Sequence, residues 1–257
     1  MSSGEESPTE SGSLELAILG SGSAFSEVGH NAGYLVDQDL LLECGAPATA
    51  LLGQAGRSLA QLRQVLISHL HGDHFSQLPL LLAARAVRHE DAPPLRVAGP
   101  RGTEAQLHAL GKLDLGDDFW AHVWASGQVS VEEWSGGQSG SLGDYRIQAY
   151  QVEHAAQLTC LGFRIEKSGV RLGYSGDTTL CQGVRDLAGS VDYLLCECSS
   201  MTAPAPIHMW REEVEQLMAE CPQARFILTH LSERAQVKGA ILASDGLVLR
   251  LQAVPRD

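Results

Sequence analysis

Basic residues are scarce in this chain. Its 257 residues include 18 lysines and arginines against 31 aspartates and glutamates, which gives a net charge of −13. Affinity for nucleic acid rests largely on basic side chains that neutralise phosphates, and no basic run stands out. A large RNA partner is therefore disfavoured, although a local basic patch stays open.

Long apolar runs and a secretion signal are also missing. No segment approaches the roughly 18 consecutive apolar residues of a membrane span. Residues 1–12, MSSGEESPTESG, lack the basic and apolar blocks of a signal peptide. The six cysteines show no CxxC spacing, which indicates reduced thiols. We expect a cytoplasmic protein without membrane contact, with a disordered tail over residues 1–12 and a single domain over residues 13–257.

The chain does have a dense group of metal ligands. The segment SHLHGDH follows an apolar strand expected over residues 62–67 and contains His69, His71, Asp73 and His74. Alternate residues of an extended chain face the same side, so His69 and His71 can bind one ion together. The intervening glycine allows a bend that directs the next two ligands to a neighbouring point. Such nitrogen and carboxylate ligands suit zinc, and next manganese or iron.

Three further strand ends carry side chains of the same kind. They are His154 after a strand at 146–152, Asp177 after one at 170–174, and His230 after one at 224–229. A lone histidine at a strand end is more often a structural hydrogen-bonding group. Four such ends in one chain instead predict one shared rim.

In order and spacing these residues resemble the metallo-β-lactamase superfamily: HxHxDH, then His154, Asp177 in SGDT and His230 in LTH. GSGSA at 20–24 and LECG at 42–45 look like the branch that holds the tRNA 3′-end endonuclease RNase Z and related phosphodiesterases. The resemblance covers residues 14–251. It implies an α/β (α+β) fold, the four-layer αββα metallo-β-lactamase sandwich.

The same resemblance implies how the ligands divide. One metal ion would be held by His69, His71 and His154. The second would be held by Asp73, His74 and His230, with Asp177 bridging both. True β-lactamases usually have cysteine or serine at the position of Asp177, so hydrolysis of a β-lactam is disfavoured.

Two further pairs of residues resemble elements of the RNase Z-like branch. Glu197 in CECS and His208 in HMW match its HEAT and HST elements only at Glu and His. By resemblance His208 would lie near the scissile group, oriented by Glu197, with Asp73 as both ligand and base. Capping of the following helix is the alternative role for His208. Ser232 and Arg234 match LTHxSxR and would bind a phosphate oxygen, the alternative being an exposed serine and a solvated arginine.

The rest of the pattern predicts the elements around these motifs. Helices are expected near residues 46–54, 75–88, 102–111, 180–188 and 209–220, mainly strand and turn over 117–175, and a hairpin over 240–251 that turns at Asp245-Gly246. Strands clustered in each half, with helices between them, fit two central sheets covered by helices.

Together these features predict a dinuclear metal-dependent hydrolase, with two divalent ions, zinc first, and a metal-bridging hydroxide. We expect a phosphodiesterase that acts on a small or single-stranded phosphodiester. A tRNA 3′-end endonuclease is the first alternative, although His154 and Asp177 are only 23 positions apart, too close for the tRNA-binding arm that one major form inserts there. A thioester or lactone hydrolase, which would share the ligands, and a metal-loaded sensor protein also stay open. The resemblance leaves a homodimer open as well.

Overall fold

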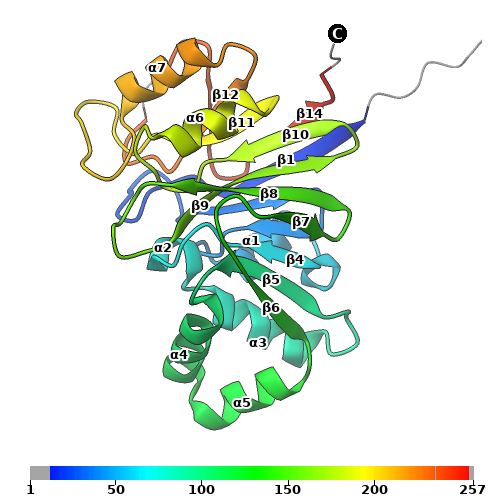
Figure 1. Cartoon of the computed structure of the whole chain (residues 1–257). Helices are drawn as coiled ribbons and strands as arrows, with labels where there is room; N and C mark the ends of the chain where they lie inside the picture. The colour runs from blue at the N-terminus through cyan, green and yellow to red at the C-terminus, as the bar shows by residue number, and fades with distance from the viewer. Residues whose placement is uncertain (1–11, 235, 255–257) are drawn as a thin grey trace, which may run out of the picture.

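Two β-sheets packed face to face form the centre of the protein (Figure 1). The computed structural model describes residues 12–234 and 236–254, so the predicted tail lies outside the described residues except for Gly12. Within them the first sheet has seven strands, which pair antiparallel from β14 to β3 and parallel from β3 to β6. In spatial order they are β14 (Val248–Gln252), β1 (Ser13–Gly20), β2 (Gly33–Val36), β3 (Leu40–Leu42), β4 (Gln64–Leu66), β5 (Leu95–Pro100) and β6 (Val129–Trp134).

The second sheet repeats this plan. It also has seven strands in the described part of the chain, parallel from β13 to β10 and antiparallel from β10 to β7. They are β13 (Ile241–Leu242), β12 (Arg225–Thr229), β11 (Tyr193–Glu197), β10 (Val170–Tyr174), β9 (Cys160–Lys167), β8 (Tyr145–Val152) and β7 (Ser139–Leu142). In the parallel half of each sheet the carboxyl ends of neighbouring strands lie at one edge, and the predicted ligands after β4, β10 and β12 lie there. His154 follows β8 of the antiparallel half, which runs in the same direction as β10.

Helices cover the outer face of each sheet, so the predicted four αββα layers are confirmed (Figure 1). On the first sheet these are α1 (Ala48–Gln54), α3 (Leu78–Arg88), α4 (Thr103–Leu115) and α5 (Asp117–Ala125), and on the second α6 (Gln182–Gly189) and α7 (Arg211–Glu220). Two short helices, η1 (Leu59–Gln61) and α2 (Gly72–Phe75), lie before and after β4. None of the described helices is both long and apolar enough to cross a membrane.

Among the described residues, three apolar cores hold the layers together. The central one lies between the sheets and includes Tyr34 of the first sheet with Phe163 and Tyr174 of the second. Strand β8 shows how the pattern arises: Tyr145, Ile147 and Ala149 are buried while alternate residues are partly or fully exposed. The outer cores join each sheet to its helices. Strands β10 and β11 are buried throughout, which explains their largely apolar sequence.

Residues 117–125 form a helix, so the prediction of mainly strand and turn was wrong in this segment. The aromatic and β-branched residues there favour a strand locally, yet Trp120, Val123 and Trp124 have helical spacing and pack on one side. The Trp120 ring fills the space over Gly111 of α4, where an added Cβ would lie 2.2 Å from the ring. Tertiary packing therefore decides the structure of α5.

The hairpin predicted over residues 240–251 was also wrong. Strand β13 pairs with β12 of the second sheet, whereas β14 pairs with β1 of the first. The turn at Asp245-Gly246 is present, with φ 84° at Gly246, but it carries the chain from one sheet to the other. Asp245 accepts hydrogen bonds from the main-chain N–H of Ser21 (2.9 Å) and His30 (2.7 Å), which fixes the loop after β1 to this crossover.

Candidate metal centre and active site

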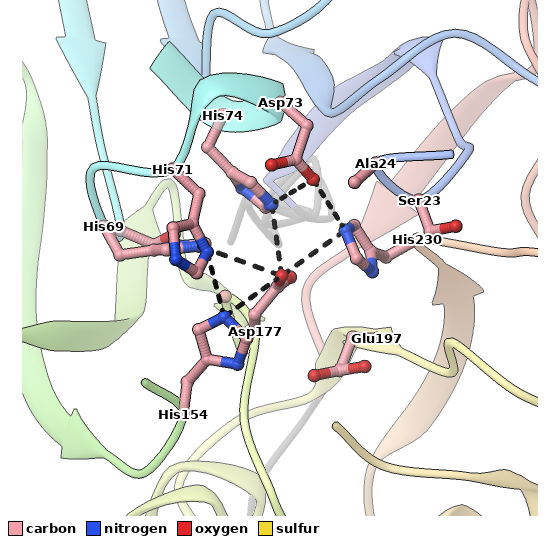
Figure 2. A network of polar contacts seen from close by, with 12 residues as sticks. Ser23, Ala24, His69, His71, Asp73, His74, His154, Asp177, Glu197 and His230 are labelled. Carbon is pink, nitrogen blue, oxygen red and sulfur yellow. Dashed lines mark hydrogen bonds and ion pairs between the residues drawn. The ribbon is translucent and has the colours of Figure 1, made fainter. Parts of the chain in front are cut away.

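Seven ligand-type side chains meet at the edge where the carboxyl ends of the strands converge (Figure 2). They are His69 and His71 after β4, Asp73 and His74 in α2, His154 after β8, Asp177 after β10, and His230 after β12. Main-chain hydrogen bonds join the sheets here, from Leu161 N–H to the carbonyl oxygen of Ser68 (3.0 Å) and from Leu231 N–H to that of Ser21 (2.9 Å). The structure thus brings all seven predicted ligands into one cluster.

The first group consists of three imidazoles whose ring nitrogens face one another. His71 Nδ1 lies 3.1 Å from His69 Nε2 and 3.1 Å from His154 Nε2. Two nitrogens bound to one zinc ion at about 2.0–2.1 Å and at the tetrahedral angle are about 3.3 Å apart. The spacing of this group therefore matches three ligands of one ion.

The second group has the same spacing with mixed ligands. Asp73 Oδ2 lies 3.3 Å from His74 Nε2 and 3.2 Å from His230 Nε2. Asp177 Oδ2 lies 3.3 Å and 3.4 Å from the same two nitrogens. That oxygen is also 3.8 Å from His69 Nε2 and 3.9 Å from His154 Nε2, so Asp177 stands between the two groups (Figure 2).

Burial supplies an independent test of whether these residues fit a metal. His74 is fully buried, and among the described residues neither of its ring nitrogens has a hydrogen-bond partner; Asp177 Oδ1 is likewise without one. Unpaired buried polar atoms are costly, and a cation at the cluster would compensate His74 Nε2, the ring nitrogen that faces Asp73 and Asp177. Burial, with His74 close by, lowers the pKa of His69, which favours the neutral imidazole that a metal requires. Burial opposes protonation of His74, but the carboxylates of Asp177, Asp73 and Glu43 raise the pKa of this imidazole, so a proton can take the place of a cation there. The ligand set fits divalent ions.

Backbone conformation at two positions makes this geometry possible. Gly176, directly before Asp177, has φ 58°, and an added Cβ would lie 2.8 Å from both Leu161 O and Ser68 Cβ. Only glycine allows so close an approach. His230 itself has a positive φ of 55°, an uncommon conformation for a side-chain-bearing residue that is concentrated at functional sites.

Glu43 is a further candidate residue of the site, which the sequence did not identify. It is fully buried at the end of β3, with Oε1 accepting the main-chain N–H of Ser68 (3.0 Å) and Oε2 lying 3.7 Å from His74 Nδ1. At that distance the contact is electrostatic, and Nε2 of the same imidazole faces the cluster. The sequence does contain one indication of its role, a carboxylate directly after the apolar strand Leu40–Leu42.

Glu197 and His208 also meet at the cluster. Glu197 is buried at the end of β11, and its Oε1 lies 3.1 Å from His208 Nδ1 and accepts the main-chain N–H of Thr178 (2.5 Å). Burial opposes protonation of His208, but the contact with Glu197 and the nearby carboxylates of Asp177 and Asp73 together raise the pKa of the imidazole. The alternative capping role for His208 does not hold, because Trp210 is the N-cap residue of α7.

Ser199 is a second residue that sequence analysis missed. Its hydroxyl donates to Glu197 Oε2 (2.6 Å) and lies 2.8 Å from His230 Nδ1. It therefore connects the carboxylate that holds His208 with one of the predicted metal ligands. CECS gave no signal for this role, since serine in that segment is adjacent to His230 only in three dimensions.

A pocket of about 550 Å³ opens over the cluster. Besides predicted ligands its walls include Ser23, Phe25, Ser199, Ile207, His208 and Ser232. The Ser232 hydroxyl lies 2.8 Å from that of Ser23. The Arg234 guanidinium instead donates to the carbonyl oxygens of Ala243 (3.2 Å) and Val28 (2.9 Å), and Arg234 does not line this pocket.

The sandwich fold and the histidine–aspartate cluster define the class of protein, a metal-dependent hydrolase of ester bonds. The chain belongs to the beta-lactamase superfamily, whose domain model matches residues 40–231. The predicted superfamily is therefore confirmed.

A relative at 30% identity confirms the RNase Z-like branch. Ribonuclease Z of Mycobacterium bovis is 30% identical over 194 residues that cover 71% of this chain and 69% of that protein. Two solved structures share the fold. Human tRNase Z, short form, has a TM-score of 0.73 at 21% identity, with 91% of this chain and 98% of that chain covered. A diphosphatase from the PhnP family has a TM-score of 0.72 at 15% identity, with 94% and 98% covered.

Proposed function

We propose that the protein is a dinuclear phosphodiesterase that cleaves a small or single-stranded phosphodiester. Two divalent ions, zinc first, would be held by the two ligand groups described above, with Asp177 between them. The observation that carries the proposal is the position of His208, which is held by Glu197 and lines the same pocket as the ligand cluster. Hydrolysis of a thioester or lactone does not need an acid there.

The chain's own residues would then donate and accept the protons of the reaction. When bound, the ions would supply a nucleophile at neutral pH and neutralise the charge of the phosphate. Glu197 accepts from Nδ1 of His208, so Nε2 is the nitrogen left to donate a proton to the leaving alkoxide. The raised pKa of His208 favours the protonated form that such an acid needs. Asp73 lines the same pocket, and we retain its predicted second role as acceptor of the nucleophile's proton.

The walls of the pocket favour a small substrate. No lysine or arginine of the described residues lines it, so a long polyanion would find little charge to bind beyond the ions. Ser23 and Ser232 present hydroxyl groups that can donate to a phosphate oxygen, in line with the predicted role of Ser232. Phosphate binding by Arg234 would require it to release its two carbonyl partners.

A tRNA 3′-end endonuclease is the second candidate. The names of the relatives favour it, since one is a ribonuclease Z and one solved structure is a tRNase Z. The pocket without basic residues and the net charge of −13 count against it. A cytoplasmic location and a homodimer remain predictions.

The test is the activity of metal-loaded protein on bis-p-nitrophenyl phosphate, precursor tRNA and a model thioester. We expect turnover of the phosphodiester. Its absence would refute the proposal, and specific cleavage of tRNA would favour the endonuclease. Metal binding without turnover of any of the three would favour the sensor protein.

A further inference from the structure

Phe25 is the most exposed large apolar side chain of the described residues, at 99% of its maximal accessibility. It nevertheless lines the pocket over the ligand cluster. A phenylalanine ring that stays in water contributes almost nothing to folding stability. An exposed aromatic surface beside a binding pocket is a common feature of ligand recognition.

The turn that carries Phe25 is firmly attached to the site. Ser26 N–H donates to the carbonyl oxygen of Ser23 (3.1 Å), and the Asn31 side chain donates to the same oxygen (3.0 Å). Ser23 N–H in turn donates to the carbonyl oxygen of Leu231 (3.1 Å), one residue after the ligand His230. The ring is thus presented from a supported turn.

The base of this turn lies next to the ligands. Figure 2 shows Ser23 and Ala24 beside Asp73 and His230. The position of the backbone that carries Phe25 is therefore fixed relative to the cluster. A ring carried on this backbone can reach a substrate group attached to the reacting phosphate without a rearrangement of the main chain.

A second apolar residue lines the pocket from the segment between β11 and α7. Ile207 is 41% exposed, and its carbonyl oxygen lies 2.7 Å from His154 Nδ1, so this wall is also attached to a predicted ligand. Ala24 and Ala205 add further apolar surface to the pocket. The lining of the pocket therefore combines the polar ligand cluster with several apolar side chains.

We propose that Phe25 and Ile207 hold the nucleobase of a nucleotide phosphodiester, with Phe25 as the stacking platform. The inference rests on the proposed function, since the phosphate would lie at the ligand cluster. A flat aromatic ring favours a flat aromatic partner, and every nucleobase offers such a face whatever its sequence. Because no lysine or arginine of the described residues lines the pocket, a base would be bound without a positive side chain, and the exposed apolar surfaces of Phe25 and Ile207 are available to it.

Equilibrium binding gives a test that does not depend on turnover. The probe is 2-aminopurine riboside 5′-monophosphate, whose fluorescence is quenched on stacking, titrated with zinc-loaded protein. We expect Phe25→Ala to weaken binding about tenfold, since stacking of a base on an aromatic ring is worth about 5- to 150-fold, and to abolish quenching. Phe25→Trp should retain both. Phe119→Ala, which removes another exposed ring on α5, is the matched control.

Kinetics separate this inference from the proposed function. The substrates are thymidine 5′-(p-nitrophenyl phosphate) and methyl p-nitrophenyl phosphate, which share a leaving group. Phe25→Ala should raise KM about tenfold for the thymidine ester, with kcat little changed, and leave the methyl ester unaffected. Equal losses on both esters, or unquenched probe with the unsubstituted protein, would overturn the nucleobase assignment. Failure to cleave either ester would refute the phosphodiesterase, while the binding titration would still decide the role of Phe25.

Discussion

Replacement of His208 by alanine tests the proton transfer at the proposed active site. The side chain would donate a proton to the leaving alkoxide. Loss of the side chain should therefore slow the reaction more, the more basic the leaving group is. A p-nitrophenolate departs as a stable anion, whereas the alkoxide of a dinucleotide does not. The variant should therefore discriminate strongly between these two substrates.

The expected magnitude follows from the role of His208. A positioned general acid contributes about 10²- to 10⁴-fold, which corresponds to about 3 to 5 kcal/mol of activation free energy. We expect a loss of that size in kcat for dithymidine phosphate. For methyl p-nitrophenyl phosphate the loss should stay below about tenfold, because only the contacts of the ring with the substrate are removed.

The assay compares His208→Ala with the unsubstituted protein on both substrates, together with metal content. His122→Ala serves as the control, since His122 is exposed on α5. Metal content should be unchanged, because His208 belongs to neither proposed ligand group. An unchanged rate on dithymidine phosphate, or an equal loss on both substrates, would refute the proton transfer.

Three further predictions concern the metals and the packing. Chelation should lower the unfolding temperature and added zinc restore it, since an ion at 100 times its Kd stabilises by about 2.7 kcal/mol; calorimetry that finds no shift would contradict the ligand assignment. Glu43→Gln should lower the affinity for the ion proposed at His74 about 10- to 100-fold. Elemental analysis after dialysis should then find one equivalent of metal fewer than in the unsubstituted protein, and retention of both equivalents would contradict the proposed role of Glu43. Gly111→Ala should cost about 1 to 3 kcal/mol in urea unfolding because of Trp120. Gly53→Ala, a site in α1 with open space around it, should stabilise by up to about 1 kcal/mol, and similar effects for the two would refute the packing argument.

The ligand cluster could be predicted because its information is local. His69, His71, Asp73 and His74 are adjacent in the chain, and each later ligand follows an apolar segment that is recognisable as a strand. The division into two ion sites came from resemblance, and the distances between side chains now support it independently. For these residues, closeness in the chain or a place at the end of a recognisable strand is enough to predict closeness in space.

Supporting residues were harder to predict, since their roles depend on contacts between distant segments. Glu43 acts on His74 from another strand, and Ser199 reaches Glu197 and His230 at once. The two errors in the fold have the same origin. Residues 117–125 are helical because Trp120 packs on α4, and the segment at 240–251 separates because its two strands find partners in different sheets.

The acidic character of the chain and its proposed substrate can now be reconciled. Because no basic side chain of the described residues lines the pocket, the ions would be the principal attraction for a phosphate, and they act over a short range at physiological ionic strength. A diester that fits between the ions and the apolar walls needs no further charge. A long polyanion would instead meet a surface dominated by carboxylates, consistent with the net charge of −13. The scarcity of lysine and arginine is therefore compatible with the cleavage of a phosphodiester, and its main effect is to favour a small substrate over a long polyanion.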